Sequence, residues 1–278
     1  MLARRFISAS LGAFLAASLG SGALATEVNL TAPGASEGFT ERLKSASLSI
    51  QSATKDDATS QDLLAAAQAD YNRLIGVLYA AGYYGPVISI KVDGREAGSV
   101  PPLGAPAQVN RIDIVVEQGA PFTFSRAEVT PLAPGTQLPK DFRTGAQARA
   151  DLVQGAADAS VKAWRNAGHA KVAVTGQQIT AVHPQSALSA QITLAPGPRL
   201  TFGALNIPGE SRVRDARIRE IAGLPTGEVY DPAKLKRSAD RLRRSGAFRS
   251  VALKDAATIG PGDTVDINAE LTDAKRRR

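Results

Sequence analysis

Apolar positions with a helical repeat alternate along this chain with apolar positions at every second residue. The clearest helical stretch lies between Thr59 and Gly82, where apolar side chains recur every three or four residues, as on one face of an α-helix. Two alternating runs follow, which is typical of half-buried strands. The helical positions are Leu63, Leu64, Ala67, Tyr71, Leu74, Ile75 and Leu78, and the strand positions are Ile88, Ile90, Val92, Ile112, Ile114 and Val116.

The same succession of elements recurs at a constant spacing, which indicates a tandem repeat. Three pairs of matching positions are each 78 residues apart: Gly119 and Gly197, Phe124 and Phe202, and Gly168 and Gly246. Gly82 ends an earlier copy, and the Gly- and Pro-rich stretch 94–108 accounts for its longer spacing of 86 residues to Gly168.

The third copy has the clearest element order, β-α-α-β-β. Asp231 followed by Pro232 predicts the start of its second helix, because Asp caps a helix N-terminus and Pro suits the first helical position. Gly246 suits a left-handed residue after the helix end. The predicted elements are a strand over 200–207, a helix over 213–224, a helix from Asp231 to Gly246, and strands over 248–254 and 265–271.

The other two copies fit the same order. In the first, residues 27–30 are the opening strand, residues 39–50 present one helix face, and Thr59 with Asp62 forms a capping-box pattern. In the second, we expect strands over 122–129, 171–175 and 188–194, a poorly defined helix near 138–148 and a helix over 151–167. The prediction is an α+β chain of three tandem modules, 27–117, 119–196 and 198–274, each a three-stranded mixed sheet covered by two helices.

The first 25 residues have the pattern of a secretory signal peptide. Arg4 and Arg5 precede an apolar stretch rich in small residues, and Ala23-Leu24-Ala25 fits a cleavage site, so the mature chain is expected to begin at Thr26. The alternative is an uncleaved anchor, because Phe6 to Ala25 is long enough to span a membrane.

Charge is distributed as a gradient along the chain, whose net charge is +7. Residues 26–119 hold 7 basic and 11 acidic side chains, whereas residues 199–278 hold 17 and 11. A basic end suits nucleic acid, an anionic membrane or an acidic partner. Export argues against nucleic acid, and the strands lack the regularly placed aromatic side chains that stack on bases.

The chain offers little for catalysis or for binding a cofactor. It has no cysteine and two histidines, His169 and His183, which fall in separate connections and are interpreted as surface residues. Asp56 and Asp57 lie in a polar loop, and Trp164 falls on a helix face expected to be core. Without a catalytic or metal-binding motif, we expect no enzyme, no metal and no cofactor.

Two segments of the third copy resemble the POTRA (polypeptide-transport-associated) domain. They are Gly227 to Leu235 and Arg243 to Val251, which look like its loop, second helix and following strand. With the run Ala80 to Val87 and three modules, the chain resembles the periplasmic region of Omp85-family outer-membrane assembly proteins, closest to the TamA branch. That family continues into a membrane β-barrel, so residues 275–278 are expected to be a basic tail leading to a barrel absent from this sequence.

The resemblance implies a periplasmic scaffold at the inner face of the outer membrane. Unfolded outer-membrane or autotransporter polypeptides would add a strand to a sheet edge and pass to a β-barrel, with an inner-membrane-anchored partner such as TamB. The alternative is a cell-envelope or divisome interaction protein that keeps its N-terminal anchor.

The resemblance places the strand after each second helix at a sheet edge. Lys91, Lys171 and Lys254 lie on or beside these strands, and edge lysines often prevent pairing, so a blunted edge is an equal alternative. The candidate edge residues are Val87, Ile88, Ser89, Ile90, Lys171, Val172, Ala173, Val174, Phe248, Arg249, Ser250 and Val251. A basic helix face toward the membrane or barrel is the second candidate surface, alongside simple solvation of that face: Lys236, Arg237, Arg243 and Arg244.

Overall fold

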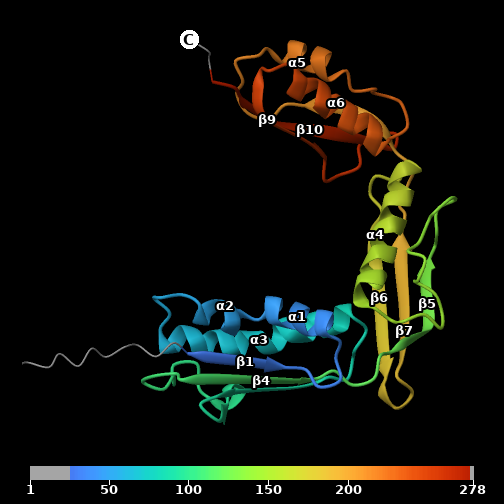
Figure 1. Ribbon diagram of the computed structural model, residues 1–278. Helices are drawn as coiled ribbons and strands as arrows, with labels where there is room; N and C mark the ends of the chain where they lie inside the picture. The colour runs from blue at the N-terminus through green and yellow to red at the C-terminus, as the bar shows by residue number, and fades with distance from the viewer. Residues whose placement is uncertain (1–25, 276–278) are drawn as a thin grey trace, which may run out of the picture.

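A computed structural model describes residues 26–275 of the chain. These residues form three α+β modules that follow one another in a bent row, with the first and third modules at opposite ends (Figure 1). The predicted fold class is confirmed. The predicted signal peptide, which ends at Ala25, lies outside the described residues. Most of the predicted basic tail also lies outside them.

In each module, a mixed sheet pairs the module's first strand parallel to its last. The strand after the long helix pairs antiparallel to that last strand. Each module has its own cluster of buried apolar side chains. The apolar residues that recur along the sequence therefore form three separate hydrophobic cores rather than one.

The first module has a four-stranded sheet in the order β1-β4-β2-β3. Its fourth strand was not expected, because the two residues of β3 fall inside the Gly- and Pro-rich stretch 94–108 and are too few to show a period. The elements are β1 (Glu27–Thr31), α1 (Glu37–Ala46), α2 (Leu48–Ala53), α3 (Ser60–Ala80), β2 (Val87–Val92), β3 (Arg95–Glu96), the 3₁₀ turn η1 (Ala97–Ser99) and β4 (Arg111–Glu117).

The expected single helix face over residues 39–50 is divided between two helices. Ser47 is in an extended conformation, and its side chain caps α2 by accepting from the Ile50 amide. The fully buried Asp70 carboxylate accepts from the Ser47 hydroxyl at 2.6 Å and from the amides of Leu48 at 2.6 Å and Ser49 at 3.1 Å. The Asp70 carboxylate, which lies on α3, accepts from the free amides at the start of α2. It therefore stabilises the break between α1 and α2.

The second module contains one α-helix, and the helix predicted near 138–148 is wrong. Pro139 and the positive φ of Gly145 oppose a helix, and residues 145–148 instead pair with the first strand. The module's second strand, predicted over 171–175, begins at Ala173 and is longer than predicted, because it continues through a bulge between Val174 and Gly176 to Val182. The elements are β5 (Thr123–Thr130), α4 (Ala150–Asn166), β6 (Ala173–Val182), the 3₁₀ turn η2 (His183–Gln185) and β7 (Ala187–Ala195).

The third module follows the predicted order most closely. Asp231 caps its second helix by accepting from the Ala233 amide at 2.7 Å, Pro232 is the first helical residue, and Gly246 has φ +70° just after the helix. The elements are β8 (Thr201–Asn206), α5 (Asp215–Ala222), α6 (Pro232–Arg244), β9 (Phe248–Asp255) and β10 (Thr264–Asp273).

The two joints between modules use the same backbone contacts. At the first joint, the Phe122 amide donates to the carbonyl of Gly82 at 2.9 Å. At the second, the Leu200 amide donates to the carbonyl of Gly168 at 2.9 Å. Each acceptor is the left-handed glycine that ends a helix. The repeat therefore reproduces the joint as well as the module.

Candidate functional site

The predicted edge of the first module, β2, is covered along much of its length. Lys91 and Val92 pair with β3, and the carboxylate of Glu96 accepts from the Ile90 amide at 3.0 Å. The Tyr71 hydroxyl, whose proton goes to Glu96, also lies 3.4 Å from the Ile90 carbonyl. Of the four candidate residues Val87, Ile88, Ser89 and Ile90, only Val87 is exposed, and Ile90 is buried.

A small cluster of hydrogen bonds holds Glu96 over the edge of β2. Besides the Ile90 amide, Glu96 accepts from the hydroxyls of Tyr71 and Ser89. Burial alone would raise the pKa of Glu96, but these hydrogen bonds outweigh it and hold the pKa below its usual value. Burial and the neighbouring carboxylate raise the pKa of Tyr71 to about 12. Glu96 is therefore charged, and Tyr71 neutral, at neutral pH.

The predicted edge of the third module, β9, carries a cationic cover. The guanidinium of Arg243 on α6 donates to the carbonyl of Val251 at 3.0 Å. Phe248 and Val251 are buried, whereas Arg249 and Ser250 are exposed. A charged side chain on an edge is a device that natural sheets use against unwanted pairing.

The edge of the second module, β6, is the longest of the three and has neither kind of cover among residues 26–275. It pairs with β7 on one side only, and its ten residues include no charged side chain and no proline. Of the predicted residues, Ala173 and Val174 lie on β6 and are exposed, whereas Lys171 and Val172 precede it. The Lys171 ammonium donates to the carbonyl of Ala256 in the third module rather than guarding the edge.

The opposite edges of the second and third sheets are partly closed by the segment before each long helix. Phe124 of β5 exchanges backbone hydrogen bonds with Ala146 and Gly145. Phe202 of β8 does the same with Glu228 and Gly227. Within residues 26–275, residues 176–182 of β6 are the longest regular stretch of a sheet edge without a second partner.

The predicted basic face of α6 is exposed but partly neutralised. Asp240 forms ion pairs with Lys236 at 2.8 Å and with Arg243 at 2.9 Å. Arg237 and Arg244 form no ion pair within the described residues. The face therefore presents two uncompensated guanidinium groups rather than four free cations.

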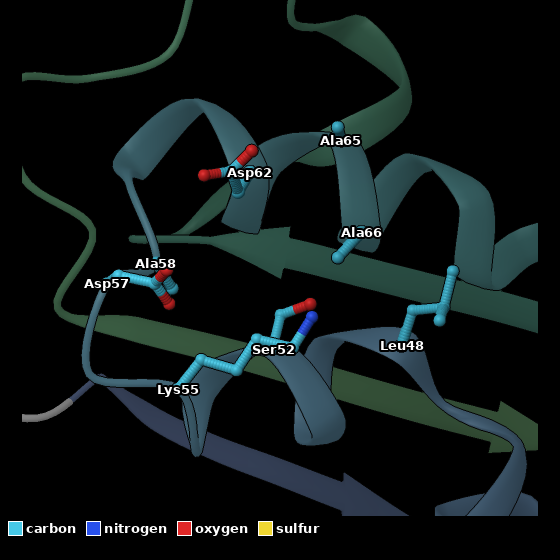
Figure 2. Close-up of a pocket in the computed structure, with 8 residues that line it drawn as sticks. All are labelled: Leu48, Ser52, Lys55, Asp57, Ala58, Asp62, Ala65 and Ala66. Atoms are coloured by element: carbon cyan, nitrogen blue, oxygen red, sulfur yellow. The ribbon is translucent and has the colours of Figure 1, made fainter.

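A cavity of about 440 Å³ lies between α2 and α3 in the first module, and Figure 2 shows the residues that line it. Small apolar side chains line one part, and Lys55, Asp57 and Asp62 lie around the opening. Asp62 is engaged in the predicted capping box with Thr59, and these hydrogen bonds lower its pKa. The carboxylate is a helix cap rather than a proton donor.

Both histidines are located at joints between modules. His183 contacts the carbonyl of Tyr84 at 3.2 Å, and His169 contacts the carbonyl of Gly197 at 2.8 Å. Trp164 packs on the core of its module, as predicted, and its indole nitrogen donates to the Pro131 carbonyl at 3.0 Å.

No three His, Asp or Glu side chains gather as a metal site within residues 26–275. None of the helices in this range is both long enough and apolar enough to cross a bilayer.

Comparisons with known proteins agree with this architecture. Residues 200–273, which make up the third module, match the family described as "POTRA: Surface antigen variable number repeat". POTRA domains 3–5 of Haemophilus influenzae BamA have a similar structure, with a TM-score of 0.57 and 16% sequence identity, over 89% of this chain and 96% of that one. The row of three modules therefore has the fold of tandem POTRA domains.

One curated relative is similar over part of its sequence. It is the outer membrane protein assembly factor BamA of Neisseria meningitidis serogroup B (strain ATCC BAA-335 / MC58), 30% identical over 80 residues, or 29% of this chain. The match spans about a tenth of that relative's length, 10%. The resemblance to the POTRA region of outer-membrane assembly proteins, expected from the sequence, is confirmed.

Proposed function

We propose that the chain is a periplasmic scaffold of outer-membrane protein assembly that binds extended polypeptide segments at the free edge of β6. The observation that carries the proposal is the unpartnered, uncharged backbone edge over residues 176–182. An extended chain can pair with such an edge through its own amides and carbonyls, almost regardless of side chains. The similarity to POTRA domains of BamA supports this role.

The covers on β2 and β9 support the choice of β6. An incoming strand would have to displace Glu96 and Tyr71 from Ile90, or Arg243 from Val251, before pairing. At β6 no such hydrogen bond has to be broken. Binding without catalysis is the activity that this arrangement supports.

The partners follow from the same proposal. Unfolded outer-membrane or autotransporter polypeptides are the clients, a membrane β-barrel receives them, and an inner-membrane-anchored protein such as TamB is a further partner, as in the TamA branch. We also propose export with cleavage after Ala25, and folding of 27–117, 119–196 and 198–274 as separate modules. The exposed Arg237 and Arg244 support a third module turned toward an anionic membrane surface.

Site-specific photo-crosslinking tests the edge. A photoreactive amino acid replaces Gln178 on β6, Ser89 on β2 or Ser250 on β9, and the probe is a urea-unfolded outer-membrane β-barrel protein diluted into buffer. We expect crosslinks from position 178 and few from the other two. Equal crosslinking from all three positions would show that the covers do not select an edge, and none from position 178 would refute the proposal.

A further inference from the structure

An apolar groove of about 700 Å³ runs beside β6, on the side of the sheet that carries α4. Its floor includes Ile179, Ala181 and Leu188 from the sheet, and the first turns of α4 form one wall with Val153. The end of α3 in the first module completes the groove with Tyr79, Ala80 and Tyr84. Its volume is within the range of ligand pockets, about 300–1,000 Å³.

The groove lies beside an edge strand that α4 covers less closely than α6 covers β9 in the third module. In the third module α5 and α6 pack side by side, and α6 covers β9. In the second module α4 packs against all three strands, while the irregular segment before it covers β5 through the buried Phe142. The part of the sheet beside β6 is left open, and Ile179 keeps 42% of its surface exposed.

The lining has one acidic side chain, Asp151, and it is paired with Arg149. Burial, followed by the nearby Asp151 charge, raises the pKa of Tyr84 to about 12, so that hydroxyl is protonated at neutral pH. An acidic occupant would be repelled by Asp151, whereas an apolar segment with neutral or basic flanks fits.

The geometry points to a side-chain pocket, shared by the first and second modules, that selects extended client segments with large apolar residues at alternate positions. The inference rests on strand addition at β6 and adds the side chains that such a strand must carry. A strand added at β6 continues the pleat of the sheet, so every second side chain lies on the face of Gln177, Ile179 and Ala181 and enters the groove. The intervening side chains lie on the opposite face, beside the exposed Gln178 and Thr180.

The groove is also continuous with the joint between the first two modules. Tyr84 packs edge-on against Phe122, with ring centroids 5.4 Å apart, and its carbonyl contacts His183 of the hairpin that ends β6. Tyr79 lies 4.9 Å from Tyr84 between ring centroids and remains 38% exposed. The first module therefore builds part of the pocket. An amphipathic strand is also the form of a transmembrane β-strand, in which apolar and polar residues alternate.

The test uses a fluorescent peptide of about 11 residues in which Val and Thr alternate around a central Phe, with a Lys at each end. Two companion peptides have the central Phe replaced by Ser, or the same composition with the alternation broken. Binding is measured by fluorescence anisotropy with the mature chain from Thr26. We expect either change in the peptide to weaken binding about tenfold, because a large apolar side chain loses its burial.

Two substitutions on β6 provide a matched pair. Val174 and Ile179 are exposed to nearly the same extent, 43% and 42%, but only Ile179 lines the groove. Ile179→Ser and Tyr79→Ala should each weaken binding of the Phe peptide several-fold, whereas Val174→Ser should not. Circular dichroism confirms that each variant folds.

The outcomes separate this inference from the proposed function. If the peptides bind β6, by crosslinking from position 178, but all three bind equally to every variant, strand addition stands and the side-chain pocket is refuted. If no peptide crosslinks to position 178, strand addition itself fails. If analytical ultracentrifugation shows a dimer that Ile179→Ser dissociates, the occupant is a second copy of the chain and the inference is overturned.

Discussion

Replacing Arg165 with Ala should uncouple the second and third modules. Its guanidinium donates to the Ala170 carbonyl at 2.9 Å, to the Tyr230 hydroxyl, and to the carboxylate of Asp255 at 2.6 Å. It also lies over the Tyr230 ring, 5.2 Å from the centroid. One side chain from α4 therefore holds two side chains of the third module.

The structure sets the magnitude of the effect. Asp255 is 14% exposed, and its second carboxylate oxygen is buried with no partner within residues 26–275, so removing Arg165 strips a half-satisfied charge of its cation. Breaking a buried pair costs about 3–5 kcal/mol. Because the Arg165 side chain is 32% exposed, we expect a smaller loss, about 2 kcal/mol in the free energy of unfolding.

The assay is thermal unfolding followed by the fluorescence of Trp164, the chain's one tryptophan, which adjoins Arg165 and packs edge-on against His169. For a module of this size, 1 kcal/mol shifts Tm by about 4–8 °C. Arg165→Ala should therefore lower Tm by roughly 10 °C. Arg165→Lys should recover part of this, because an ammonium keeps the charge but loses the planar fork.

Arg149→Ala is the matched control. Its pair with Asp151 joins side chains that are 44% and 49% exposed, and exposed pairs contribute about 0–1 kcal/mol. The reasoning is refuted if Arg165→Ala shifts Tm no more than Arg149→Ala does, or if Arg165→Ala combined with Asp255→Ala is as destabilising as the sum of the two single changes.

Three further predictions concern the cap glycines, a buried carboxylate and the β2 cover. In urea unfolding, Gly168→Ala should lower the free energy of unfolding more than Gly246→Ala does. Both glycines have positive φ, but a Cβ at Gly168 would lie 2.7 Å from Val229, whereas the space around Gly246 is open. Equal losses would contradict this. Asp70→Ala should cost about 3 kcal/mol in the same assay, because three donors lose their acceptor, and a loss below about 1 kcal/mol would rule out this role. The lowered pKa of Glu96 means that its stabilisation is present above the ordinary glutamate range, about 4.3, and is lost as pH falls through the folded value. The protection factor of the Ile90 amide, which compares its exchange with that of an unstructured amide at the same pH, should therefore fall in acid in the wild type and already be low at neutral pH in Glu96→Gln. An unchanged protection factor in Glu96→Gln would contradict the role of the carboxylate.

The third module could be predicted from the sequence almost element by element because its signals are local. Asp231-Pro232 and Gly246 set the ends of α6 through capping and backbone geometry, which need no knowledge of the rest of the fold. The constant spacing of the repeat then allowed the elements of the first and second modules, whose capping signals are weaker, to be predicted by comparison with the third.

The second module shows where local signals were not sufficient. Apolar residues around Leu138 and Phe142 resemble a helix face, but this segment packs Phe142 against Phe124 and pairs its backbone with β5. Pro139 and Gly145 were the available signs against a helix.

The difference between the three edges could not be derived from the strands alone. Glu96 covers β2 from a neighbouring turn, and Arg243 covers β9 from the preceding helix. Lys171, for which guarding the edge was one of two equal alternatives, instead donates to a carbonyl of the next module. Side chains outside a strand decided which edge stays free, and their positions depend on tertiary structure.

The measurement that tests the central claim most directly is hydrogen–deuterium exchange of the three edge strands with and without the alternating Val/Thr peptide. We predict added protection over residues 176–182 and unchanged exchange over 87–92 and 248–255. Added protection at β2 or β9 with none at β6 would contradict the account.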